Sequence, residues 1–114
     1  MRKVGGEEKL KNKSKQHYSW WSYIKEIVRD YPEAFALPTS GVAAREVDAV
    51  SDAVYATERM DGGEARLKMI RMVHWDRTHT LAGAALEIPC DRATAARWQR
   101  KFFEEVARNR GLLD

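Results

Sequence analysis

Positively charged and small side chains are grouped in one short segment, residues 92–101. Arg92, Arg97 and Arg100 stand five and three residues apart, with alanine or threonine at several positions between them. Guanidinium groups can pair bidentately with the edge of guanine or hold phosphate oxygens, and small side chains let a helix sit deep in a groove. The residue types of this segment therefore suit binding of a polyanion.

Apolar residues within and after this segment predict which of its side chains face outward. Ala95, Trp98 and Phe102 recur at intervals of three and four residues, so they share one side of a helix and are expected to face the core. The opposite side then carries the candidate contact residues: Arg92, Ala93, Thr94, Ala96, Arg97, Arg100 and Lys101.

A shorter helix and a tight turn are predicted immediately before this cationic helix. Ala85 is small enough to let two helices cross closely, and Ile88 falls on the same inner face. Residues 89–91 are typical of a turn, and the carboxylate of Asp91 is a good N-cap for the next helix. Together these features predict a helix-turn-helix over residues 81–101, with a long recognition helix that reads DNA.

Three side chains at the start of the shorter helix complete the expected contact surface. Arg77, His79 and Thr80 stand where side chains and N–H groups commonly hold backbone phosphates. They are expected to set the register on the duplex and not to read its sequence.

Helical spacing also dominates the rest of the chain. We predict helices over about residues 16–30, 41–60 and 66–75, the first ending where Tyr31-Pro32 disfavours helix. The connection at residues 32–41 is expected to be pinned by the apolar side chains Phe35 and Leu37. No segment shows the alternation of a strand, so the predicted fold is all-α with about five helices.

The second of these helices carries a narrow apolar seam. The seam consists of Ala43, Val47, Val50, Val54 and Thr57, at gaps of four and three residues. Such a seam packs either inside the domain or against a second copy of the chain, and we favour packing inside the domain.

Charge and composition divide the chain into three parts. Residues 1–15 are rich in lysine and are expected to form a flexible basic tail. Residues 16–62 form an N-terminal helical pair with an acidic block, suited to assembly or partner contact, and residues 63–114 form the helix-turn-helix DNA-binding region. The small net charge of +3 conceals this division.

Several functional classes are disfavoured by the residues present. Cys90 is the only cysteine, which excludes an internal disulfide, and with the three histidines it makes no zinc spacing. No stretch approaches the roughly 20 apolar residues of a membrane span, and the first 15 residues lack a secretory signal. We expect a cytoplasmic protein without metal, cofactor or membrane contact. His74 and His79 have no nucleophile or carboxylate placed by sequence to work with them, so no catalytic residue is assigned and an enzyme is not expected.

One set of positions in the segment from Arg66 to Gly111 matches a known pattern: Arg66 to Ile70, Val73, Trp75, Thr80, Leu81, Ala84, Ala85, Thr94, Ala95, Arg97, Trp98 and Phe102. With these residues the segment resembles the C-terminal part of the ArpU/RinA-type transcriptional regulators of Gram-positive phages, whose helix-turn-helix is similar to region 4 of bacterial sigma factors. The segment covers a little under half of the chain, and Pro89 and Asp91 stand where many of these proteins have glycine and serine. The resemblance implies a phage-encoded activator of late genes that binds a promoter and acts on RNA polymerase.

Three functions follow from these patterns. The leading hypothesis is a sequence-specific transcriptional regulator of double-stranded DNA that acts as a homodimer in a bacterial host. The acidic helix at about residues 41–60 would then serve assembly or contact RNA polymerase. One alternative is a small terminase-like subunit for phage DNA packaging, in which the other helices build a ring. The mass of the protein in solution would reveal such a ring. The other is a helical protein-interaction module whose basic face is ordinary solvated surface.

Overall fold

The computed structural model describes residues 19–37 and 40–113, and in these ranges every regular element is helical. The all-α prediction, with about five helices, is confirmed. The predicted basic tail at residues 1–15 and the first residues of the predicted helix at 16–30 lie outside the described ranges. The elements are α2 (Trp21–Ala36), α3 (Gly41–Glu58), α4 (Gly63–Ile70), the π-helical segment η1 (Arg71–Trp75), α5 (Leu81–Glu87) and α6 (Arg92–Asn109).

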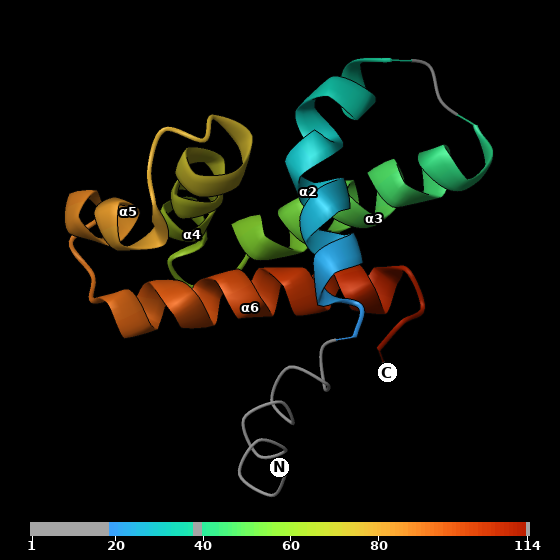
Figure 1. Cartoon of the computed structure of the whole chain (residues 1–114). Helices are drawn as coiled ribbons and strands as arrows, with labels where there is room; N and C mark the ends of the chain where they lie inside the picture. The colour runs from blue at the N-terminus through green and yellow to red at the C-terminus, as the bar shows by residue number, and fades with distance from the viewer. Residues whose placement is uncertain (1–18, 38–39, 114) are drawn as a thin grey trace, which may run out of the picture.

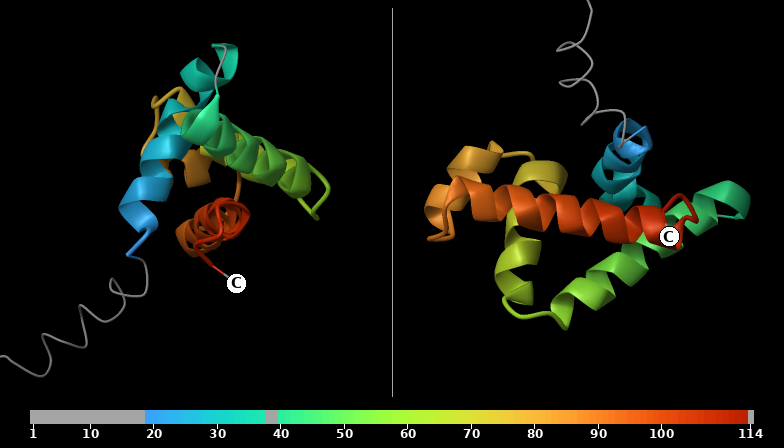
Figure 2. Two further views of the ribbon diagram at one scale, coloured as in Figure 1. Left: turned by 90° about the vertical axis from the view of Figure 1, so that its right-hand side faces the viewer. Right: turned by 90° about the horizontal axis from the view of Figure 1, so that it is seen from below.

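The long helix α6 is the central element of the fold. α2 and α3 pack over its C-terminal half, and α4 and α5 lie over its N-terminal half (Figure 1). Seen from below, α3 and α4 meet at an angle to one side of α6 (Figure 2). None of the helices in the described ranges has the length and apolarity needed to cross a bilayer.

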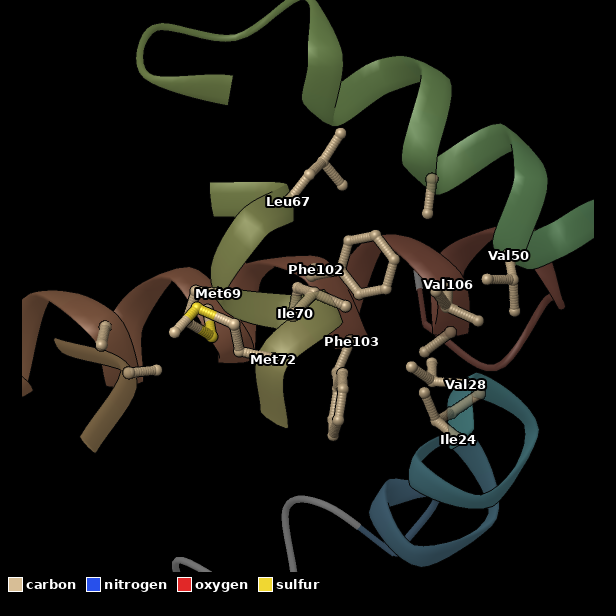
Figure 3. Close-up of a cluster of buried hydrophobic side chains, with 14 of the residues drawn as sticks. Ile24, Val28, Val50, Leu67, Met69, Ile70, Met72, Phe102, Phe103 and Val106 are labelled. Carbon is tan, nitrogen blue, oxygen red and sulfur yellow. The ribbon is translucent and has the colours of Figure 1, made fainter. Parts of the chain in front are cut away.

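The hydrophobic core is shared by all five α-helices of the described ranges and by η1. Ile24 and Val28 of α2, Val50 of α3, Ile70 of α4 and Phe103 of α6 are all fully buried, and they meet in one cluster (Figure 3). Residues on both sides of position 62 contribute to this cluster, so the two halves of the chain bury their apolar surface against each other.

The predicted seam of α3 packs inside this fold along most of its length. Val50 and Thr57 are buried, whereas Val47 and Val54 are half-buried and pack against core residues or line the cleft beside α2. Ala43, at the start of the seam, is exposed. The intramolecular packing that we favoured is therefore confirmed for the buried positions.

The predicted end of the first helix at Tyr31-Pro32 is wrong, because α2 continues through Pro32 to Ala36. Proline has no N–H, so it leaves the carbonyl oxygen of Val28, four residues earlier, without its usual helical donor. The indole Nε1 of Trp75 donates to this oxygen at 2.8 Å. A distant side chain thus replaces the missing backbone bond and lets the helix continue.

The predicted apolar anchoring of the connection between α2 and α3 is also wrong. Phe35 is 62% exposed and Leu37 is 63% exposed, so neither side chain is held by the core. Because α2 runs six residues further than expected, Phe35 lies in its last turn and not in a connecting loop. Its ring centre lies 5.4 Å from that of half-buried Tyr31.

A close approach of two backbones sets the corner between α3 and α4. Gly62 has a left-handed conformation, with φ of 67°, and a Cβ added there would meet no atom. Gly63 has ordinary helical geometry, but a Cβ there would overlap the carbonyl oxygen of Thr57 and lie 2.8 Å from that of Glu58. The two glycines are therefore required for different physical reasons.

Gly63→Ala should destabilise the protein by about 3 kcal/mol or more, since the obstructing atoms belong to the backbone and cannot rotate away. Gly62→Ala is the matched control and should cost about 1–2 kcal/mol, from backbone conformation alone. Urea denaturation followed by tryptophan fluorescence measures both. Equal effects of the two changes would contradict the close approach at Gly63.

Trp75→Phe should destabilise the protein by about 1–3 kcal/mol, because it removes the indole donor and leaves the Val28 carbonyl unpaired. The loss should be smaller in a Pro32→Ala background, where residue 32 regains an N–H that can reach this oxygen. A double-mutant cycle on unfolding free energies measures the difference. Identical losses in the two backgrounds would show that Trp75 does not compensate for Pro32.

Candidate nucleic-acid interface

α6 begins at Arg92 because the preceding residue caps it. Asp91 has the extended backbone of an N-cap, and its Oδ1 accepts a hydrogen bond from the N–H of Thr94 at 2.8 Å. A carboxylate at this place also interacts favourably with the positive end of the helix dipole. The N-cap predicted at Asp91 is confirmed.

The two sides of α6 differ in their exposure to solvent, as the apolar spacing predicted. Ala95 and Phe102 are buried and Trp98 is half-buried. On the other side Thr94 is half-buried, and the remaining predicted contact residues are exposed: Arg92, Ala93, Ala96, Arg97, Arg100 and Lys101. We call this exposed set, together with Thr94, the basic face.

Most of the charge on the basic face is not neutralised by the protein. Within the described residues, the side chains of Arg92, Arg100 and Lys101 make no hydrogen bond or ion pair. By contrast, the guanidinium of Arg29 on α2 lies within ion-pair distance of the carboxylates of Glu26 and Asp30. Positive charge is therefore available at the N-terminal end of α6 for an external anion.

Arg97 is the one cation of the basic face that is held in place. Its Nη2 donates to the hydroxyl oxygen of Thr94 at 3.0 Å. The pKa of Asp91 lies below its ordinary value, first because of hydrogen bonds from the Thr94 hydroxyl and N–H, with a further contribution from the charge of Arg97. These three side chains form a polar array over the first turn and a half of α6.

The shorter helix α5 packs closely against the start of α6 (Figure 1). Ala84 and Ala85 are buried, as is Ile88 at the end of α5, and the N–H of Cys90 donates to the carbonyl oxygen of Ala85 at 3.2 Å. The small side chains predicted at the crossing thus lie between the two helices, and they support the part of α6 that carries the basic face.

The three predicted residues before and at the start of α5 have different surroundings. Arg77 is exposed and adopts a left-handed backbone with φ of 55°. Thr80 caps α5 by accepting from the N–H of Gly83 at 3.0 Å. His79 lies 2.7 Å from a carboxylate oxygen of Glu87, a partner that the sequence did not indicate.

No hydrogen bond, ion pair or ring contact joins these three residues to the basic face among the residues that the structure describes. The carboxylate of Glu87 would repel an anion approaching His79, whereas Arg77 is exposed and would attract one.

Arg66, which belongs to the basic C-terminal half, is turned inward. Its guanidinium lies 5.7 Å from the centre of the Trp98 ring, its Nη1 donates to the sulfur of Met60 at 3.3 Å, and its Nε is buried without a hydrogen-bond partner. This cation supports the contact between α4 and α6. Spacing alone could not distinguish it from the exposed arginines.

His74 is buried and is placed for packing. Its Nε2 lies 2.6 Å from Oε1 of Gln99, and its ring centre is 5.1 Å from that of Phe103. Burial lowers the pKa of His74 from its ordinary value of 6.5. In the described ranges no three His, Cys, Asp or Glu side chains are grouped as metal ligands would be.

Comparisons with models of known protein families, with characterised proteins and with solved structures found no match to this chain. The resemblance to the ArpU/RinA-type regulators therefore stays a prediction that rests on the residues that carry it.

The burial of neutral His74 should make the protein sensitive to acid. Below pH 6.5 the unfolded chain gains a proton that the folded chain resists, so the free energy of unfolding should fall as the pH falls, by up to about 1.4 kcal/mol per pH unit. Above that value the contribution is fully present. Urea denaturation between pH 7.5 and 5.5, a range chosen to span the ordinary pKa of histidine, measures the slope.

His74→Gln is the control for this measurement, because it keeps a hydrogen-bonding group beside Gln99 but does not titrate. The variant should be less stable at neutral pH and should show a flatter pH dependence. The same slope in both proteins would assign the acid sensitivity to another group.

Proposed function

We propose that the chain binds double-stranded DNA through the basic face of α6 and acts as a sequence-specific transcriptional regulator. The observation that carries the proposal is the set of unpaired cations, Arg92, Arg100 and Lys101, that share an exposed helical face with small side chains. An α-helix fits the major groove of B-DNA, and unpaired guanidinium and ammonium groups gain most from phosphate and base acceptors.

The two helices at this end of the molecule have complementary roles in the proposal. The first turns of α6 enter the major groove, where Ala93 and Ala96 allow close approach. α5 lies behind α6 and fixes its angle, and Arg77 reaches a backbone phosphate. The resemblance to ArpU/RinA-type regulators supports a phage or prophage late-gene activator that works with RNA polymerase.

The opposite part of the molecule is suited to a protein partner in the same function. α3 exposes Asp48, Asp52 and Tyr55 to solvent. A cleft of about 60 Å³ between α2 and α3 is lined by apolar side chains together with Asp30 and Glu46. The acidic surface favours a basic partner, and we assign it to the polymerase, whereas the apolar lining of the cleft would serve assembly of a homodimer.

Fluorescence anisotropy with duplex fragments from the neighbourhood of the coding sequence, at several salt concentrations, tests the proposal. The full chain should bind one fragment tightly, with affinity that falls steeply as salt rises. Arg97→Ala/Arg100→Ala should weaken binding by about 1–3 kcal/mol for each lost contact. The matched control is Lys25→Ala/Arg45→Ala, which removes the same charge from exposed positions on α2 and α3 and should have a much smaller effect.

Equal losses of affinity in the two double variants would show that binding depends only on the overall charge of the protein, and would contradict recognition by α6. Absence of salt-dependent binding would overturn DNA binding and favour a protein-interaction module that uses the acidic cleft. Sedimentation analysis of the same samples gives the assembly state. A monomer or dimer supports regulation, whereas a large closed ring would favour DNA packaging.

A further inference from the structure

The cations of the basic face are not equivalent, because only Arg97 is restrained by neighbouring polar groups. The N–H of Thr94 donates to Asp91 at 2.8 Å, and the hydroxyl oxygen of Thr94 accepts from Arg97 at 3.0 Å. Arg97 therefore reaches back along the helix toward its capped end. In helices that dock in the major groove, the first turns are the part that meets base edges.

The carboxylate of Asp91 fixes which groups donate and which accept in the hydrogen bonds that join Asp91, Thr94 and Arg97. A hydroxyl carries one hydrogen, and an ionised carboxylate can only accept, so the Thr94 hydroxyl directs its hydrogen to Asp91 and its lone pairs to Arg97. Asp91 is ionised at neutral pH, because its ordinary pKa is 3.8 and the hydrogen bonds from Thr94 lower it further. The guanidinium is thus oriented before any ligand arrives.

Arg97 keeps most of its hydrogen-bonding capacity in this arrangement. A guanidinium has five N–H donors, and the bond to Thr94 uses one of them. The side chain is exposed, so the remaining donors can form the two parallel bonds that match O6 and N7 of guanine.

The nearby carboxylate also decides which acceptor Arg97 suits. The negative charge of Asp91 repels a phosphate but not the uncharged edge of a base. The side chains of Arg92, Arg100 and Lys101 make no hydrogen bond or ion pair among the described residues, and they are the better phosphate contacts. The hydrogen bond that orients Arg97 thus separates a base-reading arginine from backbone-binding cations.

We propose that Arg97 reads a guanine in the major groove, with Asp91 and Thr94 as positioning residues that orient its guanidinium. The inference rests on the proposed DNA binding and adds to it a ligand class, a duplex with a G·C pair at one required position. It also assigns Thr94 an indirect role, because its hydroxyl is already engaged with Asp91 and Arg97.

The test begins with selection of a preferred duplex from a randomised pool by the full chain. Each guanine of that duplex is then replaced by 7-deazaguanine, which lacks the N7 acceptor, and affinity is measured by anisotropy. One replacement should weaken binding of the full chain by about tenfold. Thr94→Val removes only the hydroxyl and keeps the backbone cap to Asp91, and it should reduce this discrimination to about twofold. Thr94→Ser restores the hydroxyl and should restore the discrimination.

Two further readouts separate positioning from folding and from phosphate binding. The thermal midpoint of Thr94→Val should fall only slightly, because the backbone cap to Asp91 remains, and the slope of affinity against salt concentration should not change, because the phosphate contacts remain. Undiminished discrimination in Thr94→Val would overturn the positioning role of Thr94, and the absence of any guanine whose N7 matters would overturn the guanine assignment. Both results would leave DNA binding standing. A chain that binds no duplex would overturn the proposed function itself.

Discussion

The burial of the Phe103 ring on α6 brings together the elements that surround it. Its ring centre lies 4.7 Å from that of Trp21 on α2 and 5.1 Å from that of His74 on η1. The side chain is fully buried within the shared cluster (Figure 3). A rigid interior resists changes of even one methylene group, so the axial rotation of α6 is set by this packing. The outward direction of the basic face is a consequence of that rotation.

Polar groups inside the fold are satisfied mainly by partners that are distant in sequence. Trp75 donates to the Val28 carbonyl, and Asn109 donates to the carbonyl oxygen of Ala49 at 3.0 Å. The hydroxyl of Tyr23 donates to Glu46 at 2.6 Å and accepts from Arg110 at 3.1 Å. Each of these bonds joins two different elements, and an unpaired partner in the interior would be costly. They therefore fix the helices relative to one another where apolar packing alone would allow sliding.

The sequence was sufficient where a feature depends on neighbouring residues. The cap at Asp91 and the inward spacing of Ala95 and Phe102 follow from helical geometry within a few turns, and the structure agrees with both. The helix through Pro32 was missed because its compensating donor, Trp75, is 43 residues away in the chain. The restraint on Arg97 is local in position, but it depends on side-chain rotamers that helical spacing does not determine.

The distribution of charge along α6 links the stability of the fold to its proposed role. Near its C-terminal end, Arg108 pairs with Glu105 at 2.7 Å and Arg110 bonds to Tyr23, so these cations serve the fold. In the N-terminal half and at the middle of α6, Arg92, Arg100 and Lys101 have no such partner in the described ranges. Arg100 and Lys101 stand three and four residues after Arg97, so these like charges repel one another and add no stability to the free protein. An external anion would relieve this repulsion. One helix thus joins a region that holds the fold together to a region whose cations are free to contact DNA in the proposed function.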